Sequence, residues 1–387
     1  MPPSPIYLDH AATTPVRQEV LEAMTPFFGP RFGNPSSVHR WGRDARTALD
    51  EARSRIAACL RAQSDEIVFT SGGTEGDNLA IVGPWRMRRA HGRNAVVTSP
   101  TEHKAVLEVV HQIAREGGEE RLLAVDSTGV ITSDAYTSTI DAQVAVCSVM
   151  WINNEIGVVQ DIPGIGAHAK SAGALMHTDA VQAFGKLPID MTTLPVDLLS
   201  MSGHKIGAPK GIGAIFIRRG TPFEPLFHGG SQDRGRRPGT ENVAFAVGLA
   251  VAAELQLAER ERECARLCAL RDTLQSAILA RVPDAIVHGA TAMRAPHILS
   301  ISVPGTDSES LLMALDLAGI AASGGSACQS GSVSPSHVLS AMGVSRSLAG
   351  AAVRLSVGML STDADIARVC EVFPALVEKA RRLAGAA

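Results

Sequence analysis

Three polar segments each follow a short apolar run and hold residue types that could take part in chemistry. Residues 71–76, Ser-Gly-Gly-Thr-Glu-Gly, open a predicted helix, and the free backbone N–H groups there can bind a phosphate. Residues 177–182, His-Thr-Asp-Ala-Val-Gln, include the carboxylate of Asp179, and residues 202–205, Ser-Gly-His-Lys, end on the amine of Lys205. Each segment alone also fits an ordinary role: a capped tight turn, a helix N-cap or a solvated lysine.

Taken together, the three segments favour one kind of site. Residues 71–76 lack the Gly-Lys-Ser/Thr ending of a nucleotide P-loop and the spacing of a dinucleotide fingerprint. Parallel strands place their ligand groups at the carboxyl edge of a sheet, where all three segments would meet. A phosphate cradle, a lysine for a Schiff base and a carboxylate that keeps a pyridine nitrogen protonated are what a pyridoxal-phosphate site requires.

Cys328 differs from the other five cysteines in its surroundings. It lies in residues 321–335, a stretch of small and turn-forming residues that predicts an exposed, mobile thiol. Such a loop could carry sulfur from the site to an acceptor, and the alternative is a flexible linker whose cysteine is incidental. The remaining cysteines lie in apolar or helical patterns that predict structural thiols: Cys59, Cys147, Cys264, Cys268 and Cys370.

The elements that must position these residues follow an alternating pattern. Short β-rich runs and helical stretches alternate up to about residue 217, which is typical of a parallel α/β sheet. Strands are predicted at 66–70, 94–98, 145–150, 175–177, 196–201 and 213–217, with helices from about 75, from about 103 and near 162–171. A long helix is predicted over 240–280, followed by strands at 297–303 and 353–357 and helices from about 308 and 363. We therefore predict a large domain over 16–258 and a small α+β domain over 259–387, joined by 1–15.

Composition excludes several classes of protein. The 387 residues include 36 Lys plus Arg and 39 Asp plus Glu, a formal charge of −3, so no nucleic-acid or membrane partner is expected. The first residues, Met-Pro-Pro-Ser-Pro-Ile-Tyr, do not resemble a secretory signal, so a cytoplasmic protein is expected. The six cysteines form no C-x-x-C pair, which argues against a zinc knuckle or a disulfide framework.

Over nearly its whole length the chain resembles the cysteine desulfurases of the class V aminotransferase fold type. The matching segments are residues 7–14 (YLDHAATT), 70–75 (TSGGTE), 101–104 (TEHK), 153–161 (NNEIGVVQD), 202–205 (SGHK), 236–242 (RRPGTEN) and 325–328 (GSAC). The resemblance implies a PLP-dependent transferase of fold type I, with a mostly parallel seven-stranded sheet and a smaller α+β C-terminal domain. It also implies a homodimer that converts L-cysteine to L-alanine and passes the sulfur on.

The resemblance assigns a role to each matching position. Lys205 would hold pyridoxal 5'-phosphate as an imine, Cys328 would accept the sulfur as a persulfide, and His103 would stack on the ring and move the substrate-thiol proton. Asp179 would pair with the pyridine nitrogen and Gln182 with the ring hydroxyl. The phosphate would be held by Gly73, Thr74, Ser202 and His204, together with Thr240 of the partner subunit. Asn154 and Arg354 would bind the substrate carboxylate.

Several alternatives remain open at this point. Other enzymes of the same fold, an aminotransferase, a kynureninase-like hydrolase or a selenocysteine lyase, also need Lys205 and Asp179, but the first two do not need Cys328. A non-catalytic sulfur-relay or scaffold protein is the alternative from another class. The sulfur acceptor could be an iron–sulfur scaffold, a tRNA-thiolation relay or a nitrogenase-type system, and the end at Ala387, without an extended tail, leads us to expect altered scaffold docking. No resident metal is expected, apart from transient ligation of an iron–sulfur cluster by Cys328.

Overall fold

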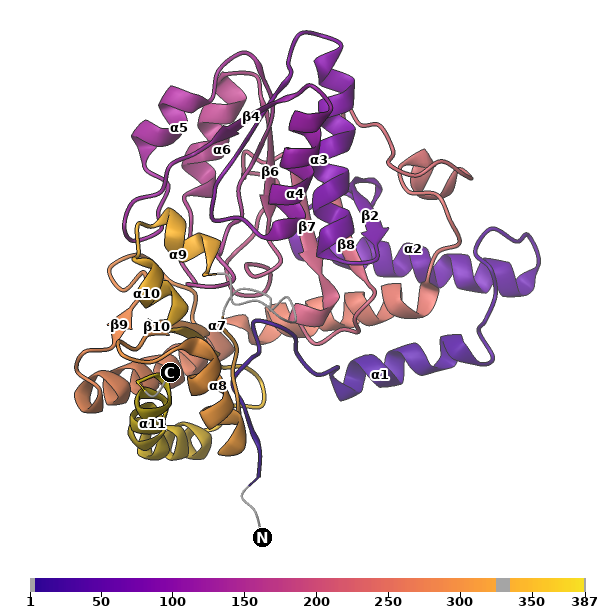
Figure 1. Ribbon diagram of the computed structural model, residues 1–387. Helices are drawn as coiled ribbons and strands as arrows, with labels where there is room; N and C mark the ends of the chain where they lie inside the picture. The colour runs from indigo at the N-terminus through magenta and orange to yellow at the C-terminus, as the bar shows by residue number, and fades with distance from the viewer. Residues whose placement is uncertain (1–3, 325–334, 386–387) are drawn as a thin grey trace.

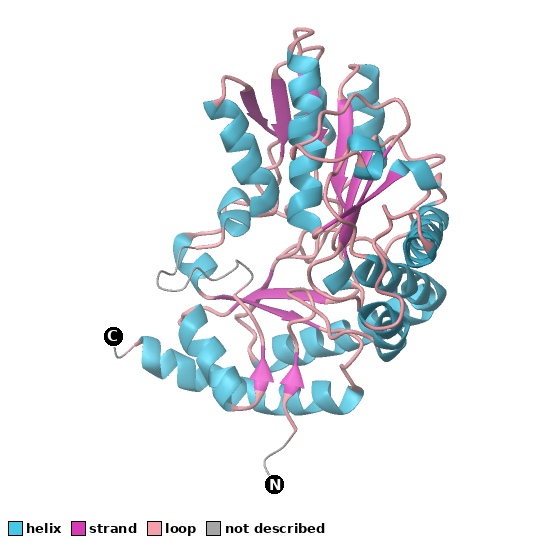
Figure 2. Cartoon of the chain, turned by 90° about the vertical axis from the view of Figure 1, so that its right-hand side faces the viewer, coloured by secondary structure: helices cyan, strands magenta, loops and turns pink. Residues whose placement is uncertain are grey.

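The computed structural model describes residues 4–324 and 335–385. Cys328 and most of the predicted loop 321–335 therefore lie outside the described residues. The chain forms a large sheet flanked by helices, with a smaller group of strands and helices packed beside it (Figures 1 and 2). None of the helices in the described ranges combines the length and the apolar character needed to cross a membrane.

A mostly parallel sheet of seven strands forms the larger part, in the order β2-β8-β7-β6-β5-β3-β4. Its strands are β2 (Ile67–Thr70), β3 (Ala95–Thr98), β4 (Glu119–Leu122), β5 (Val144–Ser148), β6 (Leu175–Asp179), β7 (Leu198–Ser202) and β8 (Gly213–Ile217). Only β8 runs antiparallel to its neighbours, β2 and β7. The predicted fold class is thus confirmed. Both faces of the inner strands are buried, as expected for a sheet covered by helices on both sides.

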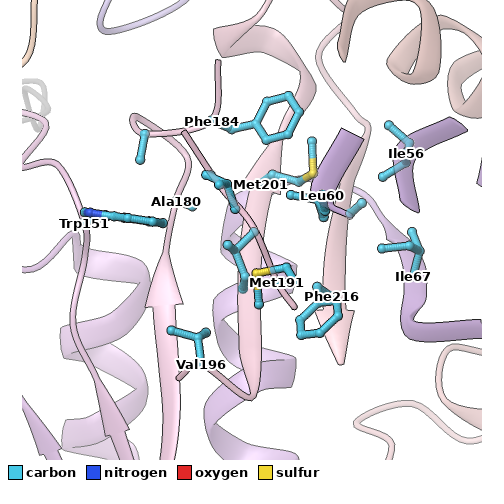
Figure 3. Packing of buried hydrophobic residues seen from close by; sticks show 14 of the residues in the cluster. Ile56, Leu60, Ile67, Trp151, Ala180, Phe184, Met191, Val196, Met201 and Phe216 are labelled. Carbon is cyan, nitrogen blue, oxygen red and sulfur yellow. The ribbon is translucent and has the colours of Figure 1, made fainter. Parts of the chain in front are cut away.

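Helices cover the two faces of this sheet and bury separate cores. The helices and 3₁₀ turns are α1 (Gln18–Met24), η1 (Thr25–Phe28), α2 (Arg40–Leu60), η2 (Ser64–Glu66), α3 (Gly73–Arg89), α4 (Lys104–Arg115), α5 (Ser133–Thr139), α6 (Ile162–Ser171), η3 (Gly203–Lys205), η4 (Gln232–Gly235) and α7 (Val243–Arg281). On one face α3 and α4 pack Trp85 and Val110 against β3 and β5. On the other, Ile56 and Leu60 of α2 lie near Phe216 of β8 (Figure 3). Burying these side chains is the main stabilising contribution to the fold.

The smaller part is built on an antiparallel sheet in the order β12-β10-β9. Its elements are β9 (Ile286–Val287), β10 (Ile298–Ser302), α8 (Ser308–Leu317), β11 (Ile320–Ala321), α9 (His337–Ala341), α10 (Arg346–Gly350), β12 (Ala352–Ser356) and α11 (Asp363–Ala384). The N-terminal strand β1 (Ile6–Tyr7) pairs with β11 in parallel. Along α7, Ala253 belongs to the core under the large sheet and Leu267 to the core of the smaller part. We propose the domain boundary between them, near 258/259, with 1–15 joined to the small domain.

Replacing Phe373 with Ala should destabilise the small domain selectively. Phe373 lies on α11 with no exposed surface, inside the core formed with β10 and β12. Removing a fully buried Phe costs about 3–5 kcal/mol because both the transfer energy and the packing are lost. Hydrogen exchange should show faster opening of β10 and α11, with β5 and β6 little changed. Leu383→Ala, at an exposed position of the same helix, is the control and should change exchange little. Equal acceleration in both sheets would contradict two separate cores.

Candidate active site

A cavity of about 570 Å³ lies where several strands of the large sheet end. Ten of the sequence-predicted residues line it: Gly73, Thr74, His103, Asn154, Asp179, Gln182, Ser202, His204, Lys205 and Arg354. Asp179 and Ser202 are the last residues of the neighbouring strands β6 and β7, and Arg354 comes from β12 of the smaller sheet. Both parts of the chain therefore contribute to the lining of one site, at the carboxyl edge where α/β sheets bind ligands.

The start of α3 provides an anion-binding end of the cavity. The helix begins at Gly73, and its N-cap, Gly72, offers no side chain to cap the first N–H groups. A Cβ atom at Gly73 would lie 2.8 Å from Cγ2 of Val181, so a larger residue would not fit without movement. His204 lines the same cavity, and burial lowers its pKa to about 4, which makes it a neutral hydrogen-bonding group. A phosphate group fits these donors and the positive helix end.

The amine of Lys205 is buried and poised to act as a nucleophile. Its Nζ donates hydrogen bonds to the carbonyl oxygens of Ala11 and Ala12, the latter at 2.7 Å. Burial, reinforced by the positive charge of Arg354, lowers the pKa of Lys205 to about 8, although Asp179 and Asp9 oppose this shift. A much larger fraction of this lysine is neutral near pH 7 than of a solvated lysine. This suits an amine that must attack an aldehyde.

This lowered pKa predicts how cofactor uptake depends on pH. Only the neutral amine attacks the aldehyde, so the rate of imine formation by the apoprotein should rise about tenfold per pH unit below pH 8 and level off above it. Stopped-flow absorbance after mixing with pyridoxal phosphate measures this rate. An exposed lysine would keep the rate rising to about pH 10. Such a profile would contradict a desolvated Lys205.

Asp179 is a buried carboxylate at the end of β6. Its Oδ1 accepts a hydrogen bond from the backbone N–H of Val181 at 2.8 Å, and the side chain lines the cavity. Burial raises its pKa, whereas the charges of His103 and Lys205 act in the opposite direction. A cationic ligand group, such as a protonated pyridine nitrogen, would offset this cost of burial. The helix N-cap alternative for Asp179 is wrong, because turns follow β6.

Gln182 and His103 are both held in defined orientations. Gln182 donates from Nε2 to the carbonyl of Ala11 at 2.9 Å, and its Oε1 contacts Nε2 of His297 at 3.2 Å. His103 is the N-cap of α4, where its Nδ1 accepts the N–H of Ala105 at 3.1 Å. Burial lowers the pKa of His103, so the neutral ring dominates and its proton lies on Nε2. Both side chains therefore present fixed polar groups to a bound ring.

Arg354 lines the cavity from strand β12 of the smaller part. It donates from Nη1 to the backbone carbonyl of Asn154 at 2.7 Å and from Nη2 to Oδ1 of Asp9 at 2.9 Å. Its side chain is only 5% exposed, so the alternative of a surface ion pair is wrong. Its Nε is buried and has no hydrogen-bond partner among residues 4–324 and 335–385. A ligand carboxylate could use the planar guanidinium as a fork.

Of the two remaining predicted residues, Thr240 is described by the structure and Cys328 is not. Thr240 lies in an exposed stretch between η4 and α7 and does not line the cavity of its own subunit. Cys328 lies outside the described residues. Among the other cysteines, burial raises the pKa of Cys59 to about 11 and also raises the pKa of Cys147, which is fully buried. Thiolate formation at these two positions is unfavourable.

Five charged or titratable residues line the cavity without having been predicted. They are Asp9, Asp77, Lys104, Glu155 and His337. Asp9, Lys104 and Glu155 lie inside the matching segments 7–14, 101–104 and 153–161, which was the available signal. Asp77 stands one helical turn after Gly73 and is buried, with Oδ1 lying 3.7 Å from Nε2 of His177. His337 carried no signal in the sequence.

Comparisons with known proteins agree with this geometry. The family model described as Aminotransferase class-V matches residues 6–369. The chain is 44% identical over 378 residues to the cysteine desulfurase IscS of Dictyoglomus turgidum, covering 98% of this chain and 96% of that protein. It is 45% identical over 379 residues to the cysteine desulfurase NifS of Azotobacter vinelandii, covering 98% and 94%.

Solved structures give the same result. A NifS-like protein superposes with a TM-score of 0.91 at 34% identity, covering 97% of this chain and 99% of that one. DndA from Streptomyces lividans superposes with a TM-score of 0.78 at 36% identity, covering 90% and 99%. Because the similarity covers nearly the whole chain, it includes the segments of both parts that line the cavity. The chain belongs to the class-V aminotransferase family and, within it, to the cysteine desulfurases, a pyridoxal-phosphate-dependent group.

Proposed function

We propose that this protein is a cysteine desulfurase that takes sulfur from L-cysteine, releases L-alanine and leaves a persulfide on Cys328. The observation that carries the proposal is that Lys205, Asp179 and the uncapped start of α3 at Gly73 line one and the same cavity. Relatives that carry the name cysteine desulfurase align with the chain over 98% of its length. The protein would act in the cytoplasm and hand its sulfur to an acceptor in iron–sulfur cluster assembly or another sulfur-requiring pathway.

Different residues would bind different groups of the cofactor. When bound, pyridoxal phosphate supplies an aldehyde that condenses with amines and a ring that takes up negative charge from the substrate Cα. Lys205 would hold the aldehyde carbon, and Asp179 would keep a proton on the ring nitrogen. Gln182 would donate to the ring hydroxyl. The phosphate would be bound by Gly73, Thr74, Ser202, His204 and Thr240 of the partner subunit.

The site would bind the substrate by its carboxylate and carry out chemistry at its Cα and sulfur atoms. Arg354 and Asn154 would bind the carboxylate, which fixes the position of Cα relative to Lys205. The amine of Lys205, released when the substrate amine takes its place, would remove the Cα proton, and its lowered pKa suits it to act as a base. His103 carries a proton on Nε2, so it could donate that proton and later accept another at the same atom.

Cys328 would attack the substrate sulfur as a thiolate. The bond between the substrate Cβ and its sulfur breaks, a bond between two sulfur atoms forms, and Cβ ends as the methyl group of alanine. The enzyme sulfur is oxidised and Cβ is reduced, so no external oxidant is needed. The net proton lost by the Cys328 thiol ends on the product carbon.

The proposal also includes a homodimer, and it predicts that a charge introduced at the subunit interface separates the two subunits. Large apolar side chains are exposed around the connection between α1 and α2, at the right-hand edge of Figure 1: Phe28, Phe32, Val38 and Trp41. Clustered apolar side chains of this kind favour a protein interface. Trp41→Glu should shift the protein from dimer to monomer in sedimentation velocity. Leu383→Glu, on exposed α11, is the control, and a monomeric unmodified protein would contradict the proposal.

One sequence of assays tests the proposed activity against its alternatives. The purified protein should show an absorption of its lysine imine that borohydride bleaches. Addition of L-cysteine and a thiol reductant should then yield alanine and sulfide in equal amounts. Colour without sulfide would favour an aminotransferase or a hydrolase of the same fold, and activity with selenocysteine alone would favour a selenocysteine lyase. Failure to bind the cofactor would favour the non-catalytic relay protein.

A further inference from the structure

A second cavity, of about 40 Å³, adjoins the candidate active site, and Gln182 and Lys205 line both cavities. His297 lines the second cavity from the smaller part of the chain, directly before β10, and its backbone carbonyl accepts the N–H of Val357 at 3.0 Å. The His297 residue is only 4% exposed, and its Nε2 lies 3.2 Å from Oε1 of Gln182. A buried histidine of the smaller part therefore contacts a side chain that is proposed to bind the cofactor ring.

The hydrogen-bond partners of Gln182 determine which way its amide points. The carbonyl oxygen of Ala11 can only accept, so the Gln182 atom 2.9 Å from it is Nε2. The atom that faces His297 is then Oε1, which also can only accept, so Nε2 of His297 carries a hydrogen. Ala11 and His297 hold the amide from two sides. An amide nitrogen carries two hydrogens, so one hydrogen of Gln182 remains for a group bound in the candidate active site.

The surroundings of His297 keep its ring neutral. Burial holds the pKa of His297 well below its usual value, and the neighbouring basic groups Lys186, Arg354, His10 and Lys205 act in the same direction. Its Nδ1 is buried and has no hydrogen-bond partner within the two described ranges of the chain. A neutral ring with its one hydrogen on Nε2 agrees with both observations, and this form donates to Gln182 at every pH at which the protein is folded and the ring uncharged.

We propose that His297 is a positioning residue for the cofactor: its Nε2–H holds the Gln182 amide so that the remaining N–H of Gln182 faces the ring hydroxyl of pyridoxal phosphate. This inference rests on the proposed function and deepens it. A hydrogen bond donated to that oxygen stabilises its negatively charged form, which lowers the pKa of the neighbouring lysine imine. Because His297 comes from the smaller part and Gln182 from the larger, the contact to the ring depends on how the two parts pack.

The position of the hydrogen on His297 can be measured without the cofactor. NMR spectra of the apoprotein labelled with ¹⁵N in its histidine side chains distinguish the two neutral tautomers, and the signals lost in His297→Gln identify this ring. We expect a hydrogen on Nε2 and a signal that shifts in Gln182→Leu, because the acceptor is then missing. A hydrogen on Nδ1, or a signal that does not respond to Gln182→Leu, would overturn the proposal.

Absorption spectra of the holoenzyme test the effect on the cofactor. The pKa of the lysine imine, read from the change of absorption with pH, should rise by about 0.5 pH unit or more in His297→Met, since Met is similar in size but has no donor. In His297→Gln the amide nitrogen can take the place of Nε2, so the imine pKa should stay near that of the unmodified protein. Equal shifts in the two variants, or no shift in His297→Met, would overturn the proposal.

A double variant separates positioning from a general effect on packing. Gln182→Leu removes the proposed contact to the ring, so adding His297→Met to it should leave the imine pKa unchanged, and a further rise would overturn the proposal. His288→Met is the matched control, because His288 is a buried histidine beside the same small sheet whose Nε2 lies 2.7 Å from Oγ of Ser302. Its imine pKa should equal that of the unmodified protein. If the unmodified protein forms no imine, the proposed function fails, whereas the NMR measurement still decides how His297 holds Gln182.

Discussion

Replacing Cys328 with Ala should abolish alanine formation from L-cysteine while the bound cofactor keeps its absorption. The reason is chemical: the substrate sulfur needs a nucleophile that accepts it, and a methyl group offers none. The fall should be at least about 10³-fold, limited only by slow attack of free thiols on the substrate sulfur. Absorbance and borohydride reduction measure cofactor binding in the same sample, and alanine is quantified by chromatography.

The control for this variant is a cysteine that the structure makes unsuitable for the role. Burial raises the pKa of Cys59 to about 11, so Cys59→Ala should retain alanine formation. Restoration of the Cys328→Ala activity by added small thiols at high concentration would fit a missing acceptor. Full alanine formation in Cys328→Ala without added thiol would mean that another group accepts the sulfur, and the persulfide at this position would be ruled out.

Lys205→Ala should remove both covalent attachment and catalysis. The amine of Lys205 donates to the carbonyls of Ala11 and Ala12 and is within electrostatic reach of Asp179, whereas Lys104, which also lines the cavity, starts helix α4. Loss of the base that takes the Cα proton should cost at least about 10³-fold in kcat. Mass spectrometry after borohydride treatment should find the cofactor attached to the unmodified protein and not to the variant.

The matched control for this change is Lys210→Ala. Lys210 is exposed and lies five residues further along, so its loss should affect neither attachment nor rate. Noncovalent retention of the cofactor by Lys205→Ala would show that the phosphate-binding end and Asp179 are intact. Attachment of the cofactor to a different lysine with normal turnover would contradict the assignment of Lys205.

The sequence predicts the large sheet well because its inner strands are short apolar runs buried on both faces. Strand β4 escapes prediction because Glu119, Glu120 and Arg121 are polar and the strand lies at the edge of the sheet. Strand β6 extends to Asp179, two residues beyond the predicted end, because its last residues are polar but pair with β7. The periodicity of apolar residues indicates which positions are buried, so strand prediction fails where a strand is exposed or where polar residues are buried for function.

The site was predictable to the extent that its residues lie in short recognisable segments. Lys205 and Gly73 belong to such segments. The pairing of Arg354 with Asp9 joins residues 345 positions apart, and the bond from Ser336 to Glu155 spans 181 positions. The first contact forms within the small domain and the second between the small and large domains, and no local pattern encodes either. The predicted contribution of Thr240 needs a second subunit.

The most direct measurement of the central claim is mass spectrometry of the holoenzyme after brief treatment with L-cysteine, without reductant. If Lys205 forms the imine and the cavity binds L-cysteine as proposed, the peptide that carries Cys328 should gain one sulfur atom, which a thiol removes. An unmodified Cys328 peptide in a sample that has produced alanine, or the added sulfur on any other cysteine, would contradict the account.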